Sequence, residues 1–256
     1  MTNTTPISLS KNLTIGGTDI LLLAGPCSVE SYEQTYAVAK SMNALGLRVL
    51  RGGAFKPRTS PNAFQGLGLE GLKILRQVAD EFGMLVISEA LGVEQLPLVA
   101  EYSDIIQIGS RNMQHFPLLW AAGEQPKPIL LKRGFMSTIA EWIAAAEHIA
   151  TRGNEQIILC ERGIRSFDSS TRNVLDVSAI AQIKASTHFP IIADPSHATG
   201  RADLVPAASR AALAAGADGL LVEVHPDPAS ALSDGDQSLP LESLPAYVDD
   251  MRRIAS

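Results

Sequence analysis

The sequence predicts one (β/α)8 barrel that spans residues 1–256. The length of 256 residues is typical of such a barrel. Eight short apolar runs alternate with amphipathic stretches, and each run is continuous, as a parallel strand buried on both faces requires. The predicted strands cover residues 20–24, 47–50, 84–87, 104–108, 128–131, 156–159, 190–193 and 219–222.

Helical signals fill the stretches between the predicted strands. Thr138 and Glu141 have the spacing of a capping box, which predicts a helix that begins there. Pro206 and Pro245 fall where first helical turns are expected. Three glycines end helical stretches just before a strand, as helix C-caps do: Gly46, Gly83 and Gly216.

Two features of the fold stay open at this stage. A doubly wound sheet is the alternative to a barrel, but its Gly-rich turn after the first strand is missing, since residues 24–27 read Ala-Gly-Pro-Cys. The segment before the first strand, through Gly17, is expected to form a small hairpin that closes the barrel bottom, with its turn in residues 14–19. Because this segment is so short, no separate regulatory domain is expected.

Composition argues against several classes of protein. Hydrophobic residues make up 46% and charged residues 19%, which favours a large core over disorder. The net charge of -6 argues against nucleic-acid binding, and no apolar run approaches the length of a membrane span. The polar N-terminus has no signal-peptide core, and two cysteines give no disulfide framework. We therefore expect a cytoplasmic protein, in which a thiol stays free.

Four side chains that suit a metal ion follow the first, seventh and eighth predicted strands: Cys27, His197, Glu223 and Asp234. In a closed barrel strand eight lies beside strand one, so these groups are expected to meet at one rim. A thiol, an imidazole and two carboxylates suit a transition metal rather than Mg2+ or Ca2+. Each has an ordinary explanation on its own, since a lone cysteine is usually a core residue and a lone histidine a cap or surface residue.

Cationic side chains gather at the same rim although the chain as a whole is acidic. They follow four different predicted strands, the second, fourth, fifth and sixth: Arg51, Lys56, Arg58, Arg111, Lys132 and Arg162. Cations that face one another repel unless an anion neutralises them, so the grouping indicates phosphate or carboxylate ligands. The alternative, a solvated basic surface, fits barrel strands poorly because helices cover their outer face.

Three further residues near the rim are ambiguous. Gly109 and Gly163 are expected to let the backbone approach a ligand closely. His225 either supports a metal ligand or packs a loop.

The strand ends carry recognisable motifs: AGPCSVES (24–31), RGGAFKPRTSP (51–61), IQIGSRNMQ (106–114), LLKRG (130–134), ILCERG (158–163), DPSHATGR (194–201), VEVHP (222–226) and LSDGDQ (232–237). Together they closely resemble 3-deoxy-D-arabino-heptulosonate 7-phosphate (DAHP) synthase. The resemblance is to the metal-dependent branch that is related to 3-deoxy-D-manno-octulosonate 8-phosphate synthase.

The resemblance implies a reaction and a cofactor. The reaction is condensation of phosphoenolpyruvate with D-erythrose 4-phosphate and water to give DAHP and phosphate, the first step of the shikimate pathway. The cofactor is one divalent ion, Mn2+, Fe2+, Co2+ or Zn2+, with Mn2+ preferred. Its implied ligands are Cys27, His197, Glu223 and Asp234. A homodimer or homotetramer is expected, and a regulator bound in trans stays open.

Substrate and catalytic residues are also implied by the resemblance. The phosphoenolpyruvate site comprises Gly109, Ser110, Arg111, Lys132 and Arg162, with Arg51 and Lys56 beside it. The sugar-phosphate site comprises Arg58, Thr59 and Ser60. The catalytic candidates are Lys132 as proton donor, Glu89 as the group that positions water, and Lys56.

Two local details bear on the choice of substrate. After Lys56 the sequence reads Pro57-Arg58-Thr59-Ser60, whereas octulosonate synthases typically carry Ala-Asn-Arg-Ser/Thr-Ser after that lysine. Pro57-Arg58 therefore favours erythrose 4-phosphate over arabinose 5-phosphate. Metal-independent relatives carry Asn at the position of Cys27, so the thiol favours metal dependence. The main alternative is therefore the octulosonate synthase that uses arabinose 5-phosphate. A non-catalytic sensor of a phosphorylated sugar and a class II-type metal aldolase fit the residues less well.

Overall fold

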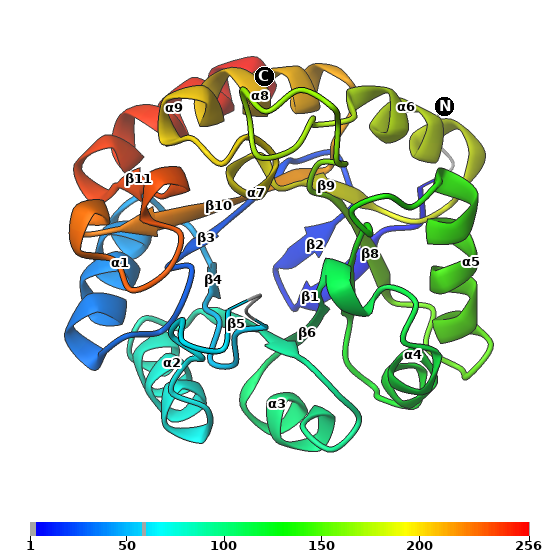
Figure 1. Ribbon diagram of the computed structural model, residues 1–256, viewed down its shortest axis with the longest axis horizontal. Helices are drawn as coiled ribbons and strands as arrows, with labels where there is room; N and C mark the ends of the chain where they lie inside the picture. Colours follow the sequence, from blue (N-terminus) through cyan, green and yellow to red (C-terminus); the bar gives the residue numbers. More distant parts are fainter. Residues whose placement is uncertain (1–3, 58–59, 256) are drawn as a thin grey trace.

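The computed structural model describes residues 4–57 and 60–255, in which eight parallel strands form a closed ring (Figure 1). β10 pairs with both β3 and β9, so the sheet closes and is not an open doubly wound sheet. Each strand overlaps one predicted apolar run, and the predicted barrel is confirmed. In ring order the strands are β3 (Leu21–Gly25), β4 (Val49–Arg51), β5 (Leu85–Ala90), β6 (Ile105–Ile108), β7 (Ile129–Lys132), β8 (Ile157–Glu161), β9 (Ile191–Ala193) and β10 (Gly219–His225).

Helices follow the barrel strands and cover the outside of the ring (Figure 1). They are α1 (Tyr32–Ala44), α2 (Leu69–Glu81), α3 (Leu96–Tyr102), α4 (Phe116–Gly123), α5 (Ile139–Ala150), α6 (Val177–Ser186), α8 (Val205–Ala214) and α9 (Leu244–Ala255). The short helix α7 (Pro195–Thr199) lies between β9 and α8. None of the helices in the described residues combines the length and apolar character that crossing a bilayer needs.

Short elements complete the rim loops. The two-residue strand β11 (Leu239–Pro240) pairs with β10. The single 3-10 turns are η1 (Ser110–Asn112), η2 (Ala202–Leu204), η3 (Pro228–Ser230), η4 (Gly235–Gln237) and η5 (Leu241–Ser243).

The predicted helix boundaries are confirmed by their caps. The Thr138 hydroxyl accepts a hydrogen bond from Glu141 N, and the Glu141 carboxylate accepts one from Thr138 N at 2.8 Å, which completes the capping box of α5. Pro206 lies in the first turn of α8. The three predicted C-cap glycines have left-handed φ angles of 74°, 61° and 97°, which glycine adopts at little cost: Gly46, Gly83 and Gly216.

Side chains of the ring alternate between two apolar cores. Leu21 and Leu23 point into the barrel, whereas Leu22 and Ala24 pack against the surrounding helices. Because both faces of each strand are buried, the strand sequences are continuously apolar. Cys160 belongs to the interior core and is fully buried there.

Leu130 is expected to contribute strongly to stability because its side chain is fully buried inside the ring. Replacing Leu130 by Ala removes buried methyl groups and leaves a cavity, which typically costs about 2–5 kcal/mol of unfolding free energy. Urea denaturation measures this value. The matched control is Leu69→Ala, since Leu69 is 41% exposed at the start of α2. Equal effects of the two substitutions would contradict the assignment of Leu130 to the core.

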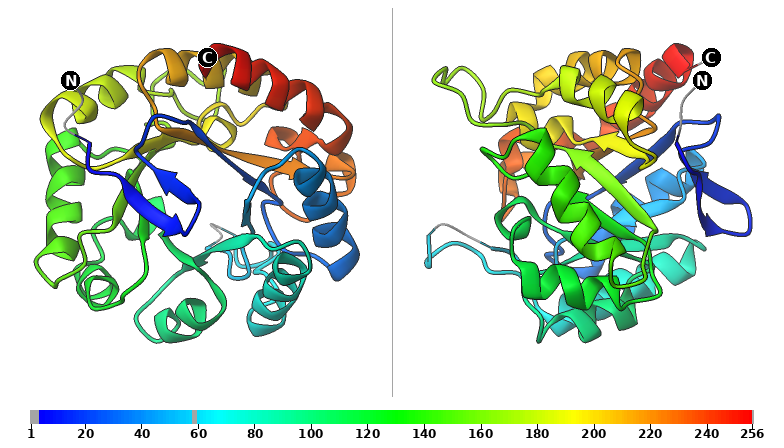
Figure 2. Two further views of the ribbon diagram at one scale, coloured as in Figure 1. Left: turned by 180° about the vertical axis from the view of Figure 1, so that it is seen from behind. Right: turned by 90° about the vertical axis from the view of Figure 1, so that its right-hand side faces the viewer.

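The N-terminal segment forms the predicted hairpin, at the end of the barrel opposite the long rim loops (Figure 2). Its strands β1 (Ile7–Ser10) and β2 (Leu13–Ile15) are antiparallel, and Ile7 and Ile15 join the interior core. The predicted position of its turn was wrong. Lys11 and Asn12 make the turn, whereas residues 14–19 begin within β2 and lead the chain toward β3. The alternation of apolar residues on both sides of Lys11-Asn12 decides the register, because Ile7 and Ile15 must share one buried face.

Candidate active site and metal centre

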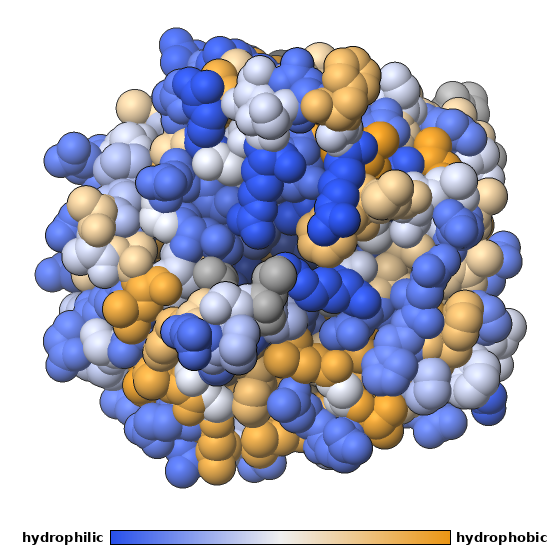
Figure 3. Space-filling view, viewed as in Figure 1, coloured by the Kyte–Doolittle hydropathy of each residue, from blue (hydrophilic) through white to orange (hydrophobic). Residues whose placement is uncertain are grey.

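The face of the molecule seen in Figure 1 has a hydrophilic hollow at its centre (Figure 3). This hollow is a cavity of about 300 Å³ at the C-terminal ends of the barrel strands. Most of the site residues predicted from the sequence line it: Arg51, Lys56, Ser60, Glu89, Gly109, Ser110, Arg111, Lys132, Arg162, His197 and Asp234. Arg58 and Thr59 lie outside the described residues.

Four donor groups meet at one edge of this cavity. The thiol of Cys27, the imidazole of His197 and carboxylate oxygens of Glu223 and Asp234 lie within 4.8 Å of one another. Cys27 Sγ is 3.3 Å from Asp234 Oδ2, and His197 Nε2 is 3.5 Å from Glu223 Oε1. Closure of the ring explains this grouping, because β10 lies between β9 and β3. Sulfur, nitrogen and oxygen donors at this spacing fit a divalent transition metal.

Burial and neighbouring charges shift the pKa values of three of the donor groups, Cys27, His197 and Glu223. It raises the pKa of the Cys27 thiol to about 12, with the nearby Glu223 carboxylate adding to the effect. It lowers the pKa of His197 to about 4, despite the adjacent carboxylates of Asp194 and Glu223. Burial alone would raise the pKa of Glu223, but His197 and Arg51 outweigh it and hold that pKa below its ordinary value. At neutral pH the imidazole and this carboxylate are therefore ready to bind a cation, whereas the thiol must first lose a proton.

Asp194 fixes the orientation of the His197 ring. Its Oδ2 lies 2.8 Å from His197 Nδ1, and its Oδ1 accepts a hydrogen bond from His197 N. A proton on Nδ1 leaves the lone pair of Nε2 directed at the donor cluster. Lys132 Nζ donates to the same Oδ2. Burial would raise the pKa of Asp194, but His197 and Lys132 hold it well below the ordinary value, so Asp194 stays ionised.

Arg51 and Lys56 bind the donor cluster directly. Arg51 Nη1 donates to Glu223 Oε1 at 2.8 Å and to the carbonyl oxygen of Pro26. Lys56 Nζ lies 3.0 Å from Cys27 Sγ and donates to the Cys27 carbonyl oxygen. Their positive charges compensate the carboxylates, so these two residues support the cluster as well as line the cavity.

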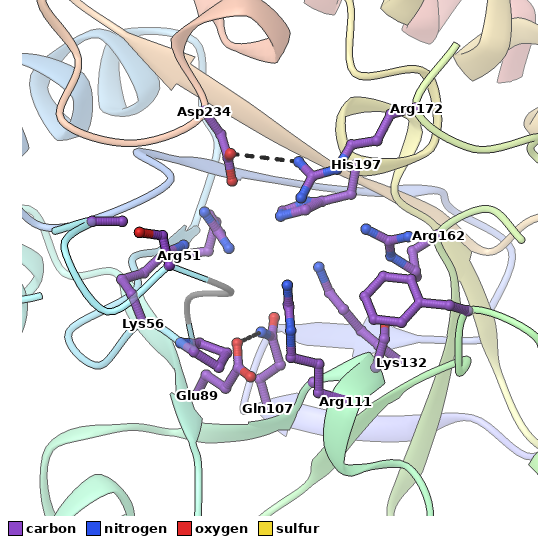
Figure 4. A pocket seen from close by; sticks show the side chains of 16 residues that line it. Arg51, Lys56, Glu89, Gln107, Arg111, Lys132, Arg162, Arg172, His197 and Asp234 are labelled. Carbon is purple, nitrogen blue, oxygen red and sulfur yellow. Dashed lines mark hydrogen bonds and ion pairs between the residues drawn. The ribbon is translucent and has the colours of Figure 1, made fainter. Parts of the chain in front are cut away.

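A second group of cations lies across the cavity from the donor cluster (Figure 4). Arg111 and Arg162 stand against the ring of Phe135, with guanidinium carbons 5.3 and 4.7 Å from its centroid. Arg162 is only 2% exposed, and among the described residues no carboxylate lies within salt-bridge distance of it. Burial lowers the pKa of this guanidinium. A buried guanidinium without a carboxylate partner indicates a site for an anionic ligand.

Parts of the protein approach closely at both glycines that were expected to admit a ligand, Gly109 and Gly163, and their role toward a ligand stays a prediction. A Cβ on Gly109 would lie 2.0 Å from Glu89 Oε1, so this glycine, which lines the cavity, makes room for the Glu89 carboxylate. Gly163 has a left-handed φ of 89°, and a Cβ there would meet Asn173 and Ala198. In both places the close approach is between parts of the protein. Gln107 holds the same Glu89 carboxylate from the side (Figure 4), at 2.9 Å.

His225 lies outside the donor cluster. Its Nε2 is 3.4 Å from Glu30 Oε2, and its Nδ1 accepts a hydrogen bond from Asp227 N. Glu30 also accepts from Leu232 N, so His225 helps to join the loop after β3 to the loop after β10. Of the two sequence interpretations, loop packing is therefore the correct one.

Three residues of the site were missed by sequence reasoning as functional candidates: Asp194, Arg172 and Gln237. Asp194 carried a signal, because it ends a strand three residues before His197 and caps α7. Arg172 lines the cavity and lies 3.5 Å from Asp234 Oδ1 (Figure 4), yet it belongs to the long loop between β8 and α6, whose path no motif predicts. Gln237 is buried beside Glu223.

This combination of a closed barrel, a four-donor cluster and a cationic cavity is that of a barrel enzyme with a candidate metal centre. The chain belongs to the DAHP synthetase I family, which it matches over residues 4–254.

Relatives support this assignment. Phospho-2-dehydro-3-deoxyheptonate aldolase of Thermotoga maritima is 57% identical over 241 residues, which cover 94% of this chain and 71% of that protein. Its crystal structure aligns with a TM-score of 0.95 at 56% identity, covering 98% of this chain and 74% of the other. 2-Dehydro-3-deoxyphosphooctonate aldolase of Syntrophotalea carbinolica is 36% identical, with 95% of this chain and 94% of that protein covered.

Proposed function

We propose that the chain condenses phosphoenolpyruvate with D-erythrose 4-phosphate and water, giving DAHP and phosphate in the first step of the shikimate pathway. The observation that carries this proposal is the buried Arg162, without a carboxylate partner among the described residues and facing a four-donor cluster across one cavity. Such an arrangement suits an anionic substrate beside a metal ion. The proposal is supported by 57% identity to a relative named as the heptonate aldolase, against 36% for an octonate aldolase.

The proposed metal ligands are Cys27, His197, Glu223 and Asp234, with Mn2+ preferred over Fe2+, Co2+ and Zn2+. The bound ion would act as a Lewis acid toward the aldehyde oxygen of erythrose 4-phosphate. Lys56 and Arg51 hold the thiol and one carboxylate in place, and their charges offset the negative charge of the ligands. In the cytoplasm, where we place the enzyme, a thiol such as Cys27 stays reduced.

The protein groups then act on the substrates. We assign the phosphate and carboxylate of phosphoenolpyruvate to Arg111, Lys132 and Arg162, with Gly109 and Ser110 beside them. C3 of phosphoenolpyruvate forms the new bond to the aldehyde carbon, water adds at C2, and cleavage of the C–O bond releases phosphate. Glu89, held by Gln107, is assigned to position the water, and Lys132 Nζ, held by Asp194, is assigned to supply a proton.

The sugar phosphate is assigned to the loop after β4. Ser60 and Pro57 line the cavity. We assign Arg58 and Thr59 to the same site from the resemblance of the sequence alone. Pro57-Arg58 favours the four-carbon sugar, because the octulosonate synthases typically carry Ala-Asn-Arg after the corresponding lysine. The alternative substrate is therefore arabinose 5-phosphate. We propose further that the barrel is the catalytic unit and assembles into a homodimer or homotetramer, which sedimentation velocity measures.

The test is a direct assay. The purified protein, stripped of metal and reconstituted with Mn2+, is incubated with phosphoenolpyruvate and erythrose 4-phosphate while the absorbance of phosphoenolpyruvate is followed. We expect turnover, loss of turnover with a chelator, and a kcat/KM for arabinose 5-phosphate lower by about 100-fold or more. No turnover after reconstitution contradicts the proposed reaction. A higher kcat/KM with arabinose 5-phosphate assigns the chain to the alternative reaction.

Metal affinity is expected to rise with pH. Between pH 6 and 8 the Cys27 thiol keeps its proton, since its pKa is about 12, whereas His197, with a pKa of about 4, is already neutral. Binding of Mn2+ must therefore displace one proton, so the association constant is expected to rise about tenfold per pH unit. Mn2+ titrations at three pH values measure this slope. The Cys27→Ser variant is the control, because its hydroxyl keeps the proton and the slope should vanish. A wild-type affinity independent of pH would show that the thiol is not a ligand.

A further inference from the structure

The loop between β8 and α6 carries none of the four proposed metal ligands, yet it touches the elements that carry them. Asn173 Nδ2 donates to the carbonyl oxygen of His197, and the backbone of Arg172 donates to Thr199 in α7. The Arg172 guanidinium lies 3.5 Å from Asp234 Oδ1 and donates to Gln237 Oε1 at 2.7 Å. The loop is thereby joined to α7 and to η4.

Gln237 continues this connection to Glu223. Gln237 Nε2 donates to Glu223 Oε2 at 2.7 Å, and Gln237 is only 2% exposed. The amide therefore uses its oxygen toward a cation and its nitrogen toward a carboxylate. If the amide were reversed, its NH2 group would face the guanidinium and its oxygen would face the carboxylate. Only the observed orientation therefore satisfies both hydrogen bonds.

Each proposed carboxylate ligand has one oxygen facing the donor cluster and the other held by this chain of contacts. Glu223 Oε1 faces His197 Nε2 at 3.5 Å and accepts from Arg51, while Oε2 is held by Gln237. Asp234 Oδ2 faces Cys27 Sγ at 3.3 Å, while Oδ1 is the oxygen nearest Arg172. Rotation of either carboxylate would break a contact on its outer oxygen.

The backbone of Asp234 adds to this restraint. It is the one non-glycine among the described residues with a positive φ, at 49°. A non-glycine residue held in the left-handed region needs surrounding contacts that favour that conformation. The hydroxyls of Ser28 and Ser233 lie 2.7 Å apart, which ties the residues next to Cys27 and Asp234 together on the other side.

We propose that Gln237 and Arg172 are positioning residues that fix the carboxylates of Glu223 and Asp234 for metal binding, so that their loss weakens the metal site without removing a ligand. This inference rests on one part of the proposed function, namely that Glu223 and Asp234 bind the metal. Polar partners that orient metal ligands typically change metal affinity by about 10–100-fold when removed.

The test compares Mn2+ dissociation constants of metal-stripped proteins, with free Mn2+ measured by electron paramagnetic resonance. Gln237→Met keeps the length of the side chain and removes both hydrogen bonds, and Arg172→Met removes the guanidinium. We expect both to bind Mn2+ about 10–100-fold more weakly, and Arg172→Lys to lie between them and the wild type. The matched control is Arg201→Met, which also removes an arginine–aspartate pair, with the exposed Asp203, and should leave the affinity unchanged.

Substitution with Co2+ adds a readout of ligand geometry. The d–d absorption bands of bound Co2+ depend on the arrangement of its ligands, so Gln237→Met should shift them. The thiolate charge-transfer band should persist, because Lys56 still holds Cys27. Thermal melting of the metal-free proteins reports folding. If Gln237→Met does not fold, Arg172→Met decides the matter, since its side chain is 35% exposed.

The outcomes separate this inference from the proposed function. Wild-type Mn2+ affinity and unchanged Co2+ spectra in folded Gln237→Met and Arg172→Met would overturn the inference, whatever reaction the enzyme performs. A wild-type protein that binds Mn2+ and forms no DAHP would instead contradict the proposed reaction and leave the affinity comparison intact. Weaker binding in both variants, with Arg201→Met unchanged, supports the inference.

Discussion

Replacing Cys27 by Ala is expected to abolish metal binding and turnover. The substitution removes the only sulfur donor of the four-donor cluster and leaves one imidazole and two carboxylates. Loss of a supporting contact alone costs about 10–100-fold in metal affinity, so loss of a ligand should cost more than about 100-fold. Mn2+ binding and the phosphoenolpyruvate assay measure the two effects. The Lys56 contact with the carbonyl oxygen of residue 27 survives, so the lysine keeps one of its two partners.

Cys160 provides the matched control for this experiment. It is also buried, and burial raises the pKa of its thiol as well, but it lies in the apolar interior of the barrel and outside the donor cluster. Cys160→Ala should lower the unfolding free energy by about 1 kcal/mol through loss of packing and leave metal affinity unchanged. A Cys27→Ala protein that still binds one Mn2+ with wild-type affinity would contradict the proposed ligand set.

The parts of the fold that were predicted correctly are those with one simple physical cause. A strand buried on both faces must be apolar throughout, so Leu21, Leu22 and Leu23 indicate a barrel strand although they face different cores. Ring closure follows from the count of such strands. Closure of the ring also predicts that residues after the first, seventh and eighth strands are neighbours. The proximity of the four donor groups follows from that topology, and their role as ligands stays a prediction.

What could not be predicted depends on side-chain reach and on loop paths. The strand ends indicate that Arg51 and Lys56 are near the rim, but only the structure places Arg51 against Glu223 and Lys56 against Cys27. Arg172 enters the site through a long loop that pairs with α7, and that pairing is non-local. Gly109 is a further example, because a glycine in the sequence indicates that some group lies close to the backbone but not which group. The structure shows that this group is the Glu89 carboxylate.

Replacing Arg162 by Met is expected to reduce kcat/KM for phosphoenolpyruvate by about 30- to 5,000-fold. The guanidinium is buried, and breaking a buried charge-assisted contact to a ligand costs about 2–5 kcal/mol, where each 1.36 kcal/mol is a factor of ten. The KM for erythrose 4-phosphate should change far less, because that sugar is assigned to the loop after β4. Steady-state kinetics with each substrate varied in turn separate the two effects.

Arg165 is the matched control, since it packs against the same Phe135 ring at 5.2 Å but is exposed and does not line the central cavity. Arg165→Met should therefore change kcat/KM by less than about threefold.

The stability of the Arg162→Met protein is expected to change in the opposite direction to its activity. Burial lowers the pKa of Arg162, so without substrate the charge is costly, and its removal should leave the melting temperature unchanged or raised. Phosphoenolpyruvate should raise the melting temperature of the wild type and not of this variant, because only a protein that binds the ligand is stabilised by it. An Arg162→Met protein with a wild-type KM for phosphoenolpyruvate and the same ligand-induced shift would mean that the buried guanidinium does not bind the substrate.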